Sequence, residues 1–186
     1  MKSFTISTKM AKYSTQTLAD HFQVCDNGGT NQIKGKAFED LACYLFKTVP
    51  GVSIALRNQM NAYNNEEIDV AIWNDKSRHG FDFLPNVILI ECKNWSKPVS
   101  SIEVNWFCQK VASRGLDFGV LIANNGITGD ENDLTASHNA IAYHLMNRRR
   151  IIVITRQEIN DFNETGDLIH LVKEKICLLT VAGRIY

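Results

Sequence analysis

The stretch NVILIECKNWS at residues 86–96 contains a run of aliphatic residues that ends in two charged side chains. Such a continuous apolar run is typical of a strand that is buried on both faces of a sheet. Charged side chains are rare there, because an unpaired ion away from water costs free energy. Glu91 and Lys93 stand two residues apart, so they project from the same face of the strand. The stretch therefore predicts a core strand that ends by presenting an acid and a base together.

The segments on either side of this strand predict alternating helices and strands, from their apolar spacing and their capping and turn residues. The strands before it would form an antiparallel hairpin or meander, and those after it would be joined by βαβ crossovers. The fold class is therefore α/β, with a mixed central sheet flanked by helices on both faces, in one domain. In the helix at residues 100–115, Ile102, Trp106 and Val111 are predicted to form the inner face. The predicted strands cover 52–60, 66–73, 87–93, 118–124 and 151–155, and the predicted helices cover 14–24, 35–49, 100–115, part of 129–150 and most of 157–178 as one helix or a pair.

Composition and charge limit the classes of function. The 186 residues are enough for one domain with a substantial core. Twenty Lys and Arg residues balance twenty Asp and Glu residues, which argues against bulk electrostatic binding of nucleic acid but permits a local basic patch. We expect no membrane span, because no run of about 18 apolar residues is present. Five cysteines without a CxxC pair or a Cys/His cluster predict free thiols in a reducing cytoplasm.

Asp69 breaks the apolar alternation of the predicted strand at residues 66–73, as Glu91 and Lys93 interrupt the next strand. If these two strands are neighbours, the carboxylates of Asp69 and Glu91 converge at one end of the sheet. Two carboxylates with water are suited to Mg²⁺, a hard cation that prefers oxygen ligands. A lysine on the same face stabilises developing negative charge, or holds or deprotonates the attacking water. These are the groups that metal-assisted hydrolysis of a phosphodiester requires.

The pattern IDV-x₂₀-ECK at residues 68–93 resembles the motif of the PD-(D/E)xK, or restriction-endonuclease-like, superfamily. The setting is similar as well, because ECK ends an apolar strand, a helix with an acid precedes the motif, and a βαβ-like run follows it. The resemblance covers roughly residues 34–155 and is closest to the small Mrr-like branch, which is associated with cleavage of foreign or modified DNA. The proline that names the superfamily is absent before the aspartate. Residues 1–33 and 156–186 match nothing assignable and are interpreted as an N-terminal extension and a C-terminal helical extension of a single nuclease-like domain.

The resemblance implies a role for each residue of the motif. Asp69 and Glu91 would bind Mg²⁺, with the backbone carbonyl of Cys92 completing the shell, and Mn²⁺ is expected to substitute. Lys93 would position the attacking water and stabilise the pentacovalent transition state. The motif therefore predicts an enzyme, a metal-dependent phosphodiesterase.

Residues on the helices around the motif extend the predicted site. Glu39 in KGKAFEDL matches a helix glutamate that joins the site in the Mrr-like branch, where it would bind a second metal or its water. Gln109 in FCQKV matches a recurring glutamine that would orient substrate or water. The arginines at residues 148–150 have two interpretations, phosphate contacts or the solvated end of a helix, and we favour the second. The expected contacts to the nucleic-acid backbone are Lys36, Lys97 and Lys110.

The motif leaves the target and the partners open. We interpret the protein as a Mg²⁺-dependent endonuclease that acts on DNA in bacterial or phage defence. One alternative is a nuclease-fold DNA-binding or partner-docking subunit that is active only in a complex. Another is an RNA-directed nuclease or toxin, because the motif addresses the phosphate and does not separate RNA from DNA. A homodimer is expected for cutting both strands of a duplex, and a protein partner would supply target selection.

Overall fold

A computed structural model describes residues 10–61, 66–129 and 137–186 of the chain. The turn predicted in NAYNN falls mostly on residues 62–65, and the start of the helix predicted in 129–150 falls on residues 130–136. Both lie outside the described residues. None of the helices within the described ranges is both long and apolar enough to span a membrane.

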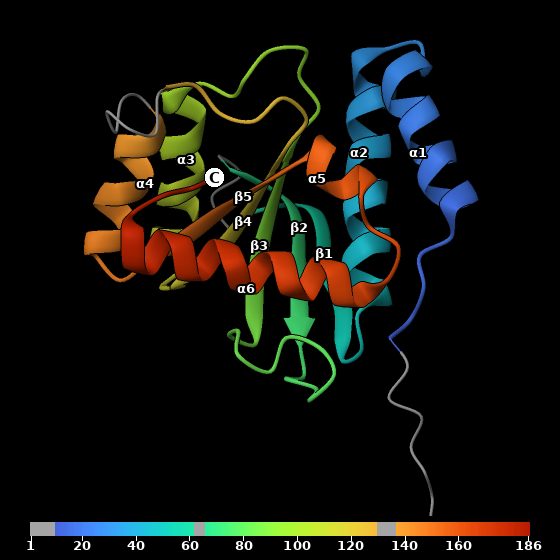
Figure 1. The fold of residues 1–186 in the computed structure, drawn as a ribbon. Coiled ribbons are helices and arrows are strands. Elements are labelled where there is room, and N and C mark those ends of the chain that lie inside the picture. The colour runs from blue at the N-terminus through green and yellow to red at the C-terminus, as the bar shows by residue number, and fades with distance from the viewer. Residues whose placement is uncertain (1–9, 62–65, 130–136) are drawn as a thin grey trace, which may run out of the picture.

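The described residues form a five-stranded mixed sheet in the order β1-β2-β3-β4-β5 (Figure 1). The first three strands are antiparallel neighbours, and β3, β4 and β5 run parallel to one another. This arrangement confirms the predicted change from an antiparallel meander to βαβ crossovers. The strands are β1 (Val52–Met60), β2 (Glu67–Asn74), β3 (Val87–Lys93), β4 (Phe118–Ala123) and β5 (Arg150–Thr155).

Capping residues define where most of the helices begin. The Ser14 side chain accepts a hydrogen bond from the Thr17 N–H, and Ser100 caps α3 in the same way, as predicted. The second helix begins earlier than residue 35, because Thr30 accepts from the Ile33 N–H and adds a turn. The helices are α1 (Thr15–Asn27), α2 (Asn31–Thr48), α3 (Ser101–Ser113), α4 (Ser137–Met146), α5 (Arg156–Asn160) and α6 (Thr165–Ala182).

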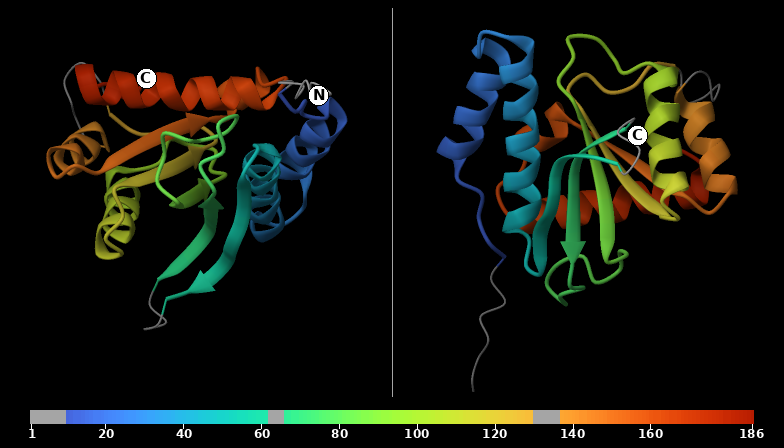
Figure 2. Two further views of the ribbon diagram at one scale, coloured as in Figure 1. Left: turned by 90° about the horizontal axis from the view of Figure 1, so that it is seen from below. Right: turned by 180° about the vertical axis from the view of Figure 1, so that it is seen from behind.

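Helices cover both faces of the sheet (Figure 2). On one side α2 packs against β1, β2 and β3, and it also contacts α6, which crosses β5. On the other side α3 packs against β4 and against α4. The aliphatic run of β3 lies between these layers, so Ile88, Leu89 and Ile90 are at most 4% exposed. The quoted stretch is therefore a central strand that is buried on both faces, as predicted.

The inner face of α3 differs from the predicted one. Ile102 and Trp106 are 66% and 55% exposed, so placing them against the core was wrong. Val111 is buried as predicted, and the other buried residues are Val104, Phe107 and Cys108, which follow helical spacing equally well. Two apolar stripes overlap on this helix, and contact with β4 selects one of them.

Alanine substitutions at adjacent positions of α3 should separate these two stripes. Phe107→Ala should lower the free energy of unfolding by about 3–5 kcal/mol, because it leaves a cavity in the core. Trp106→Ala removes a larger side chain from the exposed face and should cost less than about 1 kcal/mol. Urea unfolding of the two variants and the wild type measures both values. Equal losses would contradict the described orientation of α3.

Candidate active site

The candidate site lies where β2 and β3 separate, at the carboxyl end of β3. The last paired residues of the two strands are Val70 and Ile90. Beyond this pair, the Cys92 N–H donates to the Asp69 side chain, with 2.8 Å between the nitrogen and Oδ2. The Asp69 carboxylate thus takes the place of the backbone carbonyl that would accept this hydrogen bond if β2 and β3 stayed paired. The conformation holds the Asp69 carboxylate beside the end of β3, and the strands diverge around it.

Glu91 is a buried acid held between two lysines. It is only 4% exposed, and its two oxygens lie 2.9 Å from different ammonium groups, Oε1 from Lys93 Nζ and Oε2 from Lys110 Nζ. Lys93 comes from the same strand, whereas Lys110 reaches across from α3. Lys93 also lies 3.6 Å from a carboxylate oxygen of Glu103 and 5.5 Å from the centre of the Trp95 ring. A buried carboxylate needs such compensation, because desolvation of an unpaired charge is costly.

The two carboxylates interact electrostatically. Burial, and then the negative charge of Glu91, raise the pKa of Asp69 to about 7, although the Cys92 N–H and the lysines oppose the shift. Burial lowers the pKa of Lys93, but the nearby carboxylates, Glu91 first, outweigh this effect and leave the pKa above its ordinary value. Lys93 is therefore a cation at neutral pH. Asp69 is an acid whose ionisation is opposed by burial and by the charge of Glu91.

A cleft of about 440 Å³ opens over these residues. Asp69, Cys92 and Lys93 form part of its lining, together with Trp95 just after the strand. Its opposite wall is the start of α2, which lies at the same end of the molecule as the carboxyl end of β3 (Figure 1). The remaining lining residues are Asn31, Lys34, Gly35, Glu39, Asn94, Ser96 and Lys97.

The end of α1 and the start of α2 are tied to the residue that follows β3. The Asn94 side-chain amide donates to the backbone carbonyls of Cys25 and Lys34, at 3.1 and 3.2 Å. The Lys34 ammonium in turn donates to the Asp26 carbonyl at 2.6 Å. Sequence reasoning assigned no role to Asn94 or to residues before 34, because these contacts join segments that are far apart in the chain. The N-terminal extension is therefore part of the cleft wall.

The other predicted site residues are distributed unevenly around the cleft. Glu39 lines it, with its carboxylate 3.4 Å from Arg57 Nη2 and its pKa raised mainly by burial. Lys97 also lines the cleft, whereas Lys36 and Gln109 are exposed and are not among its lining residues. Lys110, expected to contact phosphate, is bonded to Glu91. The signal in the sequence that could have suggested a second cation is the position of Glu91 directly after an apolar run.

The arginines at residues 148–150 lie away from this cleft. Arg148 and Arg149 lie between the end of α4 and the start of β5, and Arg150 is the first residue of β5. The candidate site is at the carboxyl end of the parallel strands, so these arginines are at the opposite end of the sheet. The interpretation as the solvated end of a helix is wrong for Arg150, whose guanidinium lies 5.8 Å from the centre of the Phe118 ring.

The fold and the site together define a class, the restriction-endonuclease-like nucleases. A comparison with protein families supports this class: the family model Mrr_cat, described as restriction endonuclease, matches residues 30–162, which is more than half of the chain. The chain belongs to this Mrr-type restriction endonuclease family of the PD-(D/E)xK superfamily, as the sequence motif predicted. A search of curated proteins found no match. The chain therefore carries a restriction-type nuclease domain.

Metal-free protein should lose stability as the pH rises from about 4 to about 7. The pKa of Asp69 is about 7 in the folded chain and about 3.9 in an unfolded chain, so the folded protein retains a proton that the unfolded chain has released. By linkage, the free energy of unfolding falls across this window by an amount on the order of 3 kcal/mol. Urea unfolding in EDTA, compared with Asp69→Asn, measures this contribution. The same pH dependence in both proteins would contradict the raised pKa.

Proposed function

We propose that the protein is a metal-dependent endonuclease that hydrolyses phosphodiester bonds in DNA. The observation that supports this most strongly is the group at the divergence of β2 and β3, where Asp69 and Lys93 line one cleft and the buried Glu91 carboxylate pairs with Lys93. We further propose that it acts in the cytoplasm, in defence against foreign DNA. The five cysteines are free thiols, in agreement with a reducing compartment.

The donor atoms of this site fit a hard divalent cation such as Mg²⁺. Asp69 and Glu91 lie close enough that the charge of Glu91 raises the pKa of Asp69, and a bound cation would relieve this repulsion. The backbone carbonyl of Cys92 is a candidate third ligand, and Glu39 is the next acid along the cleft. Within the described residues, no cluster of three or more His, Cys, Asp or Glu side chains is placed to hold a metal. The proposed donors are the Asp69 and Glu91 carboxylates, with the Cys92 carbonyl and water completing the shell.

Each residue of the site would have its own role in the reaction. When bound, the cation would polarise the phosphate and lower the pKa of a water molecule. Lys93, a cation at the mouth of the cleft, would donate hydrogen bonds to the attacking water and to the phosphate oxygens, on which negative charge increases in the transition state. Lys110 is a positioning residue whose ion pair with Glu91 orients the carboxylate. Lys97, exposed at the cleft, is placed to contact a neighbouring phosphate.

A subunit that works only with a partner is a second candidate. The observation that favours it is a set of exposed apolar side chains on α3 and α4, which pack side by side. Such a surface is typical of protein contacts and would serve either a homodimer or a protein that selects the target. The side chains are Ile102, Trp106, Tyr143 and Met146.

Cleavage of supercoiled plasmid with Mg²⁺ or Mn²⁺ tests the proposed activity. Wild-type protein should nick or linearise the plasmid, and Lys93→Ala should slow this by about a thousandfold, because it removes a preorganised donor to the developing charge. Glu91 keeps Lys110 as a partner in this variant, so the fold should survive. Lys47→Ala, an exposed lysine at the end of α2, is the matched control. Near-normal cleavage by Lys93→Ala would refute the role of Lys93. If the wild type degrades a matched RNA faster than the DNA, the RNA-directed alternative is favoured.

Metal binding has a readout that is independent of cleavage. Addition of Mn²⁺ should raise the melting temperature of the wild type by several degrees, since a ligand at about 100 times its Kd stabilises by about 2.7 kcal/mol. Asp69→Asn should abolish this increase, because it removes one of the two carboxylates. Asp117→Asn, an exposed acid before β4, should leave it intact. An equal increase in all three proteins would place the metal elsewhere.

A further inference from the structure

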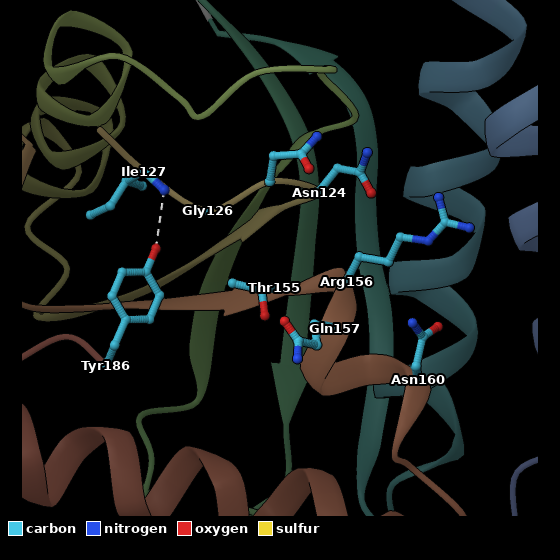
Figure 3. Close-up of a pocket in the computed structure, with 9 residues that line it drawn as sticks. Asn124, Gly126, Ile127, Thr155, Arg156, Gln157, Asn160 and Tyr186 are labelled. Atoms are coloured by element: carbon cyan, nitrogen blue, oxygen red, sulfur yellow. Dashed lines mark hydrogen bonds between the residues drawn. The ribbon is translucent and has the colours of Figure 1, made fainter. Parts of the chain in front are cut away.

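A second pocket, of about 540 Å³, lies at the carboxyl ends of β4 and β5 (Figure 3). Its volume is in the range of small-ligand sites, about 300–1,000 Å³. Four of its lining residues carry carboxamides, and we refer to it as the amide pocket. Tyr186 and Ile127 lie on one side of it, and Arg156 lies on the other (Figure 3). The four carboxamide residues are Asn124, Asn125, Gln157 and Asn160.

The amide pocket adjoins the active cleft. The strands β3, β4 and β5 are parallel neighbours about 4.8 Å apart, so their carboxyl ends form one continuous edge. The Asn124 N–H donates to the Lys93 carbonyl at 2.9 Å. The Asn125 side-chain amide donates to the carbonyl of Trp95, a lining residue of the active cleft, at 2.6 Å. The two cavities therefore share a wall, and a nucleotide whose phosphate lies at Lys93 has its base within reach of the pocket.

The charges around the amide pocket favour a neutral ligand. Among the described residues that line the pocket, Arg156 is the only one with a charged side chain. Its guanidinium makes two hydrogen bonds to the Asp26 carboxylate, one at 2.7 Å, and lies 4.5 Å from the centre of the Phe22 ring. The bond to Asp26 raises the pKa of Arg156 and neutralises its charge locally. A phosphate has no unpaired cation to meet here, whereas a neutral group with donors and acceptors meets several amides.

The wall formed by Tyr186 is held in place by specific contacts. Its hydroxyl oxygen accepts a hydrogen bond from the Ile127 N–H at 3.0 Å (Figure 3). Lys175, which is 3% exposed, lies 5.1 Å from the centre of the Tyr186 ring and binds Glu158 at 2.7 Å. Gly126 adopts a φ of 67°, and a Cβ there would lie 2.8 Å from the Tyr186 hydroxyl. The glycine thus permits the close approach that gives the pocket its shape.

We propose that the amide pocket binds one nucleobase of the DNA, next to the phosphate at the active cleft. This proposal rests on the proposed nuclease function. A carboxamide presents a donor and an acceptor together, which matches the hydrogen-bonding edge of a base. The Asn124 Oδ1 atom is buried and has no hydrogen-bond partner among the described residues, so a rotation of this lining carboxamide would offer an unused acceptor to an amino or ring N–H group. The base is supplied either by a single strand or by extrusion from a duplex.

The test measures base binding in EDTA, where metal-dependent cleavage does not occur. The full chain is titrated with a short thymine-rich oligonucleotide that carries 2-aminopurine, whose fluorescence reports its stacking, as a single strand and annealed to its complement. Wild-type protein should give a saturable change with at least one probe. Gln157→Ala/Asn160→Ala should weaken binding about tenfold, the factor expected for two lost hydrogen bonds. Asn105→Ala/Asn139→Ala, which removes two exposed carboxamides of α3 and α4, is the matched control and should bind like the wild type.

The outcomes separate the pocket from the nuclease. A saturable change with the single strand alone identifies an open strand as the source of the base, and a change with the duplex identifies extrusion. Equal affinity in wild type and Gln157→Ala/Asn160→Ala, or no change with either probe, overturns the proposal. If the plasmid is cut while the pocket variant binds normally, the pocket assignment fails and the nuclease stands. If base binding depends on the pocket but neither the wild type nor the pocket variant cuts the plasmid, the nuclease proposal fails and the pocket assignment stands.

Discussion

The buried carboxylate of Glu91 is the constraint on which the site depends. It is 4% exposed and takes one ammonium group on each oxygen, from Lys93 on its own strand and from Lys110 on α3. Loss of one partner of a buried ion pair is costly, because the remaining charge has no water to compensate it. The position of α3 over the sheet is therefore coupled to the chemistry at the end of β3. The ion pair between Glu91 and Lys110 thus links the packing of α3 on the sheet to the alignment of the site.

The change of strand direction at β3 explains where the cavities lie. This strand is antiparallel to β2 and parallel to β4, and β2 leaves it after the Val70–Ile90 pair. The Asp69 side chain takes the backbone N–H that becomes available. The carboxyl ends of β3, β4 and β5 then meet at one edge, where ligands of α/β sheets bind because loops and side chains converge there. The cleft at the end of β3 and the amide pocket are neighbours for this reason.

Much of the site could be predicted because it is encoded within single strands. Asp69 and Glu91 each interrupt an apolar alternation, and Lys93 shares a face with Glu91 by the two-residue period of a strand. The helix residues were harder to place. On α3 the predicted Gln109 is exposed, and the next residue, Lys110, reaches Glu91. One residue on a helix is a rotation of about 100°, so helix position alone does not identify the side chain that reaches the sheet.

The sequence by itself determined the order of the elements, the burial of β3, the mixed sheet and the three charged residues of the motif, since these follow from local periodicity and capping. Only the tertiary structure decided which apolar stripe of α3 faces the core, where Ile102 and Trp106 prove exposed. It also decided that the start of α2 forms a wall of the cleft and that Asn124 and Gln157 line one pocket. These features join segments that are distant in the chain. Their positions result from the packing of whole elements, which no local pattern records.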